Sequence, residues 1–325
     1  MNFVQLSITL ALAWFLAASL TGSVLATALV RLTPALWRDR PVARARWLFA
    51  LRMLPAALSI LFVGAVFVPA FWRFEPRDTA EAAGPVLGAL ALVAAGLIAA
   101  AGWRGARALR HAHRQSAAWL QRATAFAVNP TLPSYLVDEG GPAMSLVGLV
   151  RPRLFVARQV VEHLSAGELD AAVAHELGHR TSRDNLKRLA CICAPDLLTF
   201  TRAGADLEGE WARAAELAAD MRATSSSAVR RLDLAAALVK VARLTMAPAP
   251  IGVPCSTLHD GGDIAIRVHR LAAGAPPPPP GRPRLRRSLH AALAIAAGIV
   301  LAIACSHALP AVVQAVTETL VRVIG

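Results

Sequence analysis

Four apolar segments, each long enough to cross a lipid bilayer, constrain this chain more than any other feature. A helix needs about 20 apolar residues to span a hydrocarbon core about 30 Å thick. The segments cover residues 3–29, 48–71, 84–103 and 289–309. Hydrophobic residues make up 56% of the chain, which is high for a soluble domain. We therefore expect a mainly α-helical membrane protein with four transmembrane helices. The first should stay uncleaved, because no basic residue precedes it, with cleavage near Ser-Val-Leu-Ala at 23–26 as the alternative.

Basic residues gather at the ends of these segments and predict the orientation of the chain. Residues 31–46 hold five Arg and one Asp, whereas residues 73–81 hold two Arg and three acids. Further Arg clusters flank residues 104–287. Because basic loops stay on the cytoplasmic side, we expect 104–287 to be cytoplasmic and both termini to be extracytoplasmic in a multi-pass cell-membrane protein. The net charge of +13 then reflects contact with the lipid bilayer, and we expect no direct nucleic-acid binding.

These boundaries divide the chain into a membrane part, one cytoplasmic domain and a last span. Residues 1–103 would form three transmembrane helices with their loops. Residues 104–275 would form an α+β domain with a small sheet, and residues 276–288 a Pro- and Arg-rich linker before the fourth transmembrane helix. Residues 310–325 would form a short extracytoplasmic tail.

The expected domain begins with short strands and continues with helices. Strands are expected at 134–137, 144–149 and 154–157, separated by turn signals. Ser165, followed three residues later by Glu168, is typical of the capping box that starts a helix. Other helices are expected at 103–126, 207–223, 228–246 and 263–271, with a loop at 247–262.

The pentapeptide His-Glu-Leu-Gly-His at 175–179 indicates the chemistry of this domain. On a helix, His175 and His179 lie one turn apart on the same face, with Glu176 beside them. Two imidazoles so placed hold a zinc ion, and the neighbouring carboxylate acts as the general base for a water molecule. The motif therefore predicts a zinc hydrolase with Glu176 as its catalytic residue.

A second pair of acids, Glu216 and Asp220, follows the motif. Glu216 comes 37 residues after His179, and Asp220 lies one helical turn further on. Catalytic zinc needs a third protein ligand and an open fourth position, and Glu216 is the candidate for that ligand. Asp220 is the candidate for accepting a hydrogen bond from a zinc-bound imidazole. Alone, both would be read as solvated charges; after the motif, we expect one zinc site per chain.

The motifs leave the group that stabilises the oxyanion unassigned. His259, Arg267 and His269 lie late enough in the chain to fold back toward the zinc, although a surface or loop position is the simpler expectation for each. Tyr135 precedes the motif and is expected to pack in the domain. By analogy, a substrate strand would pair with an edge strand preceding the motif helix.

Five motifs follow one another in a characteristic order: GLVRPRL at 148–154, LSAGEL at 164–169, HELGH at 175–179, RDNL at 183–186 and ELAAD at 216–220. With three spans before the domain and one after it, they resemble the integral-membrane zinc peptidases of the BlaR/MecR beta-lactam sensor-transducer type. The resemblance covers nearly the whole chain, to about residue 309. It implies that His175, His179 and Glu216 bind zinc and that Glu176 is the general base. It also implies that the substrate is a cytoplasmic winged-helix repressor or the chain itself.

The chain departs from that family in its sensor. The family's sensors have an extracellular penicillin-binding domain with a Ser-x-x-Lys nucleophile. Here only 16 residues follow residue 309, and the two lysines, Lys187 and Lys240, are preceded at minus three by Asp184 and Ala237. We therefore expect no direct covalent sensing of beta-lactams, and a signal that arrives through a separate sensor protein.

Other functions stay open at this point. Gly178 within the motif looks more like the HtpX or CAAX-prenyl-protease type, which implies membrane quality control or processing. A catalytically silent sensor or scaffold with structural zinc is a second alternative, although structural sites usually have four protein ligands rich in Cys. A transporter would need charges inside its spans. Only Arg52 lies there, and we expect its side chain to reach out to the membrane surface.

Overall fold

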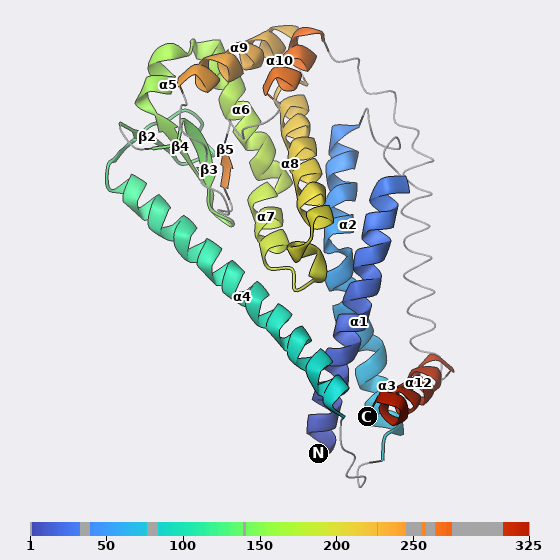
Figure 1. Ribbon diagram of the computed structural model, residues 1–325. Helices are drawn as coiled ribbons and strands as arrows, with labels where there is room; N and C mark the ends of the chain where they lie inside the picture. The colour runs from blue at the N-terminus through green and yellow to red at the C-terminus, as the bar shows by residue number, and fades with distance from the viewer. Residues whose placement is uncertain are drawn as a thin grey trace.

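Three helices long and apolar enough to cross a membrane, a lobe containing a mixed sheet and a C-terminal helix make up the described part of the molecule (Figure 1). The computed structural model describes residues 2–32, 40–76, 84–138, 141–225, 227–244, 255–257, 264–274 and 308–324. Its three helices apolar enough to cross a membrane are α1 (Phe3–Leu32), the segment Pro41–Phe74 and α4 (Pro85–Leu120). The linker expected at 276–288 and nearly all of the fourth span expected at 289–309 lie outside the described residues.

The second span consists of three helical segments joined without a break. They are α2 (Pro41–Phe62), the π-helix η1 (Val63–Phe67) and α3 (Val68–Phe74). This span passes close to α1 at Gly22, where an added Cβ atom would lie 2.7 Å from the Cα atom of Pro55. Any side chain at that position would collide with the α2 backbone, so glycine permits the close contact between the first two spans.

The third span continues directly into the lobe. α4 is a single helix of 36 residues, about 54 Å long at 1.5 Å per residue, which exceeds the hydrocarbon core by more than 20 Å. Its far end lies under the sheet (Figure 1). We expected the helix that leaves the membrane to reach residue 126. Instead it ends at Leu120, and the next residues form the strand β1 (Ala123–Ala125).

The sheet has five strands in the order β1-β2-β4-β3-β5. The expected strands are confirmed as β2 (Ser134–Val137), β3 (Met144–Val147) and β4 (Arg153–Ala157). β2 and β4 are parallel, and every other pair is antiparallel. β5 (Cys255–Thr257) pairs with β3, although its residues were expected to form a loop. The strand that directly precedes the motif helix, β4, lies inside the sheet, whereas β1 precedes that helix and lies at an edge. Pairing of a substrate strand with such an edge stays a prediction.

Helices cover both faces of this sheet. On one face, side chains of β3 and β4 pack against α6 (Ala166–Ser182) and α9 (Ala228–Leu244). On the other face, Phe155 packs against Trp119 near the end of α4, with ring centroids 5.3 Å apart. The remaining elements of the lobe are α5 (Arg158–His163), α7 (Asp184–Ile192), η2 (Leu197–Phe200), α8 (Arg202–Ala223) and α10 (Ile264–Ala272).

The lobe is packed directly against the spans. α8 lies along the first half of α2 (Figure 1), and their shared core includes Leu48 and Leu51 of α2 with Leu207 and Trp211 of α8. Burial of large apolar side chains on both helices stabilises this contact. The helix that bears Glu216 is therefore packed against a helix that is apolar enough to cross a membrane.

Arg52 lies within this α2–α8 contact, and its expected extension to the membrane surface is wrong. Its side chain is fully buried. The guanidinium donates to Asp196 Oδ2 at 2.7 Å, to Glu208 Oε1 at 2.6 Å and to Thr199 Oγ1 at 2.9 Å. A buried charge needs such partners, and these acids lie 144 and 156 residues away in the sequence.

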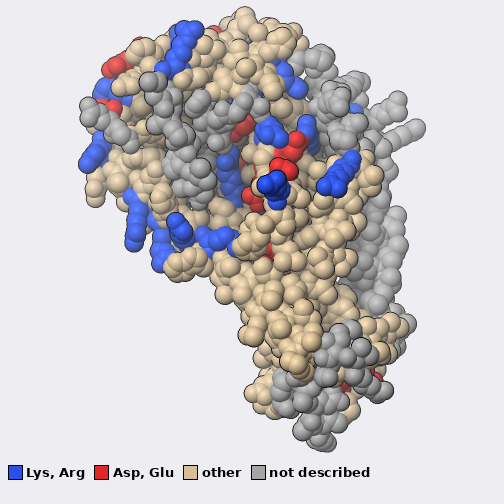
Figure 2. Space-filling model, in the orientation of Figure 1, with Lys and Arg blue, Asp and Glu red and all other residues tan. Residues whose placement is uncertain are grey.

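Charges are unevenly distributed over the face shown in Figure 2. Lys, Arg, Asp and Glu gather over the upper part, where the lobe lies, whereas the lower stem of the bundle shows almost only uncharged residues. Large apolar side chains are exposed on the spans, among them Ile8 and Leu20 of α1 and Leu92 of α4. Such an apolar surface is what contact with lipid requires.

The expected C-terminal tail contains a helix, α12 (Ala308–Ile324), beside α3 at the opposite end of the spans from the lobe (Figure 1). The indole Nε1 of Trp14 in α1 donates a hydrogen bond to Thr317 Oγ1 at 3.1 Å. Val313 is 6% exposed and belongs to an apolar cluster with Leu6 and Leu10 of α1, Phe67 of η1 and Phe71 of α3.

Candidate metal centre

The motif helix α6 begins with the expected capping box. The Ser165 side chain accepts a hydrogen bond from the Glu168 amide, and the Glu168 carboxylate accepts one from the Ser165 amide at 2.7 Å. The helix then passes through the core of the lobe. His175 and Glu176 are 0% exposed and His179 is 1% exposed, so the motif lies entirely inside the protein.

A glycine within the motif lets α8 approach α6. A Cβ atom added at Gly178 would lie 3.2 Å from the Cα atom of Ala219 and 3.3 Å from its carbonyl oxygen. These are tighter than ordinary van der Waals contacts. The close approach of the two helices places Glu216, one turn before Asp220 on α8, opposite the two histidines.

The three expected ligands converge on one point. His175 Nε2 lies 3.1 Å from His179 Nε2. Glu216 Oε2 lies 3.4 Å from His175 Nε2, and Glu216 Oε1 lies 3.4 Å from His179 Nε2. Ligand atoms on a tetrahedral zinc ion with bonds of about 2.05 Å are separated by about 3.3 Å. The two histidine nitrogens, each with one Glu216 oxygen at 3.4 Å, are therefore spaced closely enough for a zinc ion held by three residues.

Asp220 and Asp184 orient the two imidazole rings through contacts at Nδ1. The Nδ1 atom of His175 lies 2.9 Å from Asp220 Oδ1, as expected, and the Nδ1 atom of His179 lies 2.9 Å from Asp184 Oδ2. Each contact leaves Nε2 to face the centre of the cluster. Partners of this kind fix the tautomer and the ring plane of metal-binding histidines.

Asp184 is a site residue to which the sequence analysis gave no role. It follows Arg183, whose φ of 54° is in the left-handed region and turns the chain sharply between α6 and α7. Asp184 is 2% exposed, and Lys187 Nζ donates to its other oxygen at 3.0 Å. Its position, five residues after His179 and just past the end of α6, was the only feature of the sequence that could have indicated a role at the site.

Arg267 of α10 is buried beside the cluster, although a surface or loop position was the simpler expectation. Its guanidinium donates from Nε and Nη2 to the two carboxylate oxygens of Asp220, at 2.8 and 2.6 Å. Its Nη1 atom lies 3.1 Å from Glu216 Oε2. A second guanidinium, that of Arg188, has its Nη2 atom 3.8 Å from Glu216 Oε1. The two hydrogen bonds from Arg267 fix both the position and the orientation of the Asp220 carboxylate.

The charges of the cluster favour a cation at its centre. Burial would lower the pKa of His179, but the Glu216 and Asp184 carboxylates outweigh it and raise that pKa to about 10. Burial would raise the pKa of Glu216, but His179 and Arg267 hold it well below its usual range. Neither oxygen of the buried Glu216 carboxylate accepts a hydrogen bond from a described residue, and the Arg267 guanidinium contacts it through the ion pair to Oε2.

The remaining candidates are not brought to the cluster. His269 is exposed on α10, two residues after Arg267, and forms no hydrogen bond with the cluster within the described part of the chain. His259 lies outside the described residues. Tyr135 stacks on Phe155, with ring centroids 5.6 Å apart, as a packing residue.

Comparisons with known proteins add nothing to these observations. A scan against models of protein families found no match, and a search of curated proteins found no significant relative. The geometry of the cluster therefore remains the basis for any functional proposal.

Proposed function

We propose that this chain is a membrane-embedded, zinc-dependent endopeptidase with its active site at His175, Glu176, His179 and Glu216. The observation that supports this best is the convergence of both histidine Nε2 atoms and the Glu216 carboxylate, with each nitrogen 3.4 Å from one of its oxygens, close to the separation of ligands on zinc. Bound there, zinc would lower the pKa of a water molecule and polarise a substrate carbonyl. Three protein ligands within the described residues leave the fourth position open, which favours catalysis over a scaffold with structural zinc.

The surrounding residues have distinct roles in this proposal. The Glu176 carboxylate takes a proton from the attacking water and passes it to the leaving amine. Asp220 and Asp184 hold the rings of His175 and His179 through Nδ1, so that Nε2 of each ring would be left to bind the metal. Arg267 fixes Asp220 and offsets the negative charge of the buried carboxylates.

We further propose that the substrate is a protein in the cytoplasm or at the membrane surface. The basic loops support the cytoplasmic side, and the packing of α8 on α2 supports a site close to the bilayer. The resemblance to the BlaR/MecR type favours a transcriptional repressor, with the signal supplied by another component. The same closeness to the membrane also supports a second candidate, quality control or processing of membrane proteins as in the HtpX and CAAX types.

A comparison of cells that express wild type, Glu176→Gln or the control Glu162→Gln tests this function. Glu162 is exposed and outside the cluster, so its variant should behave as wild type. We expect one or more cytoplasmic or membrane proteins to be shortened in cells with wild type and the control but to stay intact with Glu176→Gln. If a regulator is shortened, the signalling function is supported; if only misfolded membrane proteins accumulate in the variant, quality control replaces it. Equal cleavage with Glu176→Gln would exclude the mechanism.

A further inference from the structure

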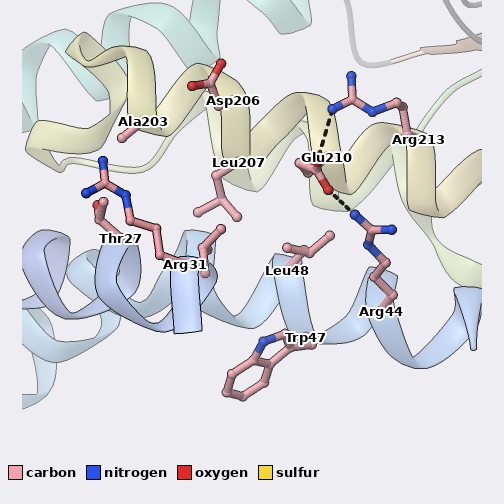
Figure 3. Close-up of a pocket in the computed structure, with 11 residues that line it drawn as sticks. Thr27, Arg31, Arg44, Trp47, Leu48, Ala203, Asp206, Leu207, Glu210 and Arg213 are labelled. Carbon is pink, nitrogen blue, oxygen red and sulfur yellow. Dashed lines mark hydrogen bonds and ion pairs between the residues drawn. The ribbon is translucent and has the colours of Figure 1, made fainter. Parts of the chain in front are cut away.

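A cavity of about 460 Å³ lies away from the metal ligands, where α1, α2 and α8 meet (Figure 3). Its walls come from the last turns of α1, the first turns of α2 and the N-terminal half of α8. Part of the wall is apolar and consists of Val30, Trp47, Leu48 and Leu207. The rest bears charges of both signs, so the cavity suits an amphiphilic occupant.

The charges in this cavity fall into a paired group and an unpaired group. Glu210 accepts from Arg44 and, at 3.0 Å, from Arg213, and Figure 3 shows it between these two side chains. Arg31 and Asp206 also line the cavity, but neither forms an ion pair or hydrogen bond with any other residue in the described part of the chain. One guanidinium and one carboxylate are therefore available to an occupant.

The cavity lies at the level expected for lipid headgroups. Arg31 is in the last turn of the apolar helix α1, and Arg44 and Trp47 are in the first turns of the second span. Arginine and tryptophan at the ends of spans mark the boundary between hydrocarbon and water. Large apolar side chains remain exposed on α1 as far as Leu25 and Leu32, which brings lipid up to the cavity.

We propose that this cavity binds the headgroup of a glycerophospholipid that has both a phosphodiester and a primary amine. The phosphodiester contacts Arg31, because guanidinium groups bind phosphate oxygens through two parallel hydrogen bonds. The ammonium group contacts Asp206, and the glycerol and upper acyl chains lie against Trp47, Leu48 and Leu207. A lipid held in this way would link α8 to both α1 and α2. This proposal does not depend on the peptidase function.

Native mass spectrometry of the full chain in detergent, titrated with phosphatidylethanolamine or phosphatidylcholine, tests the proposal. The two lipids share the phosphodiester, but the quaternary amine of phosphatidylcholine has no hydrogen to donate to Asp206. We expect the first bound phosphatidylethanolamine to bind about tenfold more tightly, since a hydrogen bond to a charged group has about that effect. Arg31→Gln should weaken binding of both lipids about tenfold. Asp206→Asn should remove the preference between them.

Arg107 of α4 provides the matched control, because it is also an exposed arginine near the end of a span but lies outside the cavity. Arg107→Gln should leave both affinities unchanged. Equal binding of the two lipids by wild type, or an equal loss in Arg107→Gln and Arg31→Gln, would overturn the proposal in favour of non-specific surface lipid. Displacement of the lipid by free phosphoethanolamine at the same concentration would also overturn it, because the ligand would then be a soluble phosphate ester.

Discussion

Replacing Arg52 should test whether the lobe and the spans form one folded unit. Arg52 on α2 forms ion pairs with two acids whose burial differs. The side chains of Arg52 and Asp196 are both 0% exposed, whereas that of Glu208 is 40% exposed. Arg52→Met removes the guanidinium and leaves the Asp196 carboxylate buried without its cation. Asp196 keeps only the hydrogen bonds from Thr199.

The expected magnitudes follow from this difference in burial. Breaking one side of a buried ion pair costs about 3–5 kcal/mol, so Arg52→Met should lower the free energy of unfolding by about that amount. Glu208→Gln should cost under about 1 kcal/mol, because water screens a partner that is 40% exposed. The double variant Arg52→Met with Asp196→Asn should recover much of the loss, since no uncompensated charge remains buried.

Denaturant unfolding of these variants in mixed micelles, followed by circular dichroism, provides the measurement. Zinc content of each folded variant should be measured alongside, because α8 bears both Glu208 and the metal ligand Glu216. An Arg52→Met variant that is no less stable than Glu208→Gln would refute the idea that this ion pair joins the lobe to the spans.

Three further predictions concern the metal centre. Asp184→Asn should weaken zinc binding about 10–100-fold while the fold persists, because it alters the partner of His179; competition with a chelator would show this, and an unchanged affinity would remove Asp184 from the site. Gly178→Val should lower zinc affinity about tenfold or more, because overpacking against Ala219 costs about 1–3 kcal/mol; full affinity would mean that α6 and α8 need not approach closely. Zinc binding at pH 7 should release at least about one proton, because carboxylates raise the pKa of His179 to about 10 and that ring must lose its proton to bind metal. Calorimetry in two buffers of different ionisation enthalpy counts these protons, and a release near zero would contradict the assigned ligands.

Features with a local or periodic signal were predictable from the sequence. Apolar runs predicted the three described spans, and the capping box of Ser165 and Glu168 placed the start of α6 correctly. The helical repeat of 3.6 residues put His175 and His179 on one face, and likewise Glu216 and Asp220. The site could be outlined because its ligands come in pairs within single helices.

Features that depend on distant parts of the chain were not predictable. Arg52 looked like a residue that would reach the membrane surface, because its acidic partners lie far away in the sequence. Arg267 comes from a helix 47 residues after Asp220, and only the packing of α10 brings them together. β1 and β5 have three residues each, too few to show an alternating pattern, and exist only through pairing with strands elsewhere.

The central claim, that His175, His179 and Glu216 hold one catalytic zinc ion, is tested most directly by the metal content of the purified chain. We expect about one zinc per chain in wild type and in Glu176→Gln, since the general base is not a ligand. Glu216→Ala should lose most of its zinc while keeping its helix content. Equal, full zinc occupancy in wild type and Glu216→Ala, or no zinc in correctly folded wild type supplied with the metal, would contradict the account.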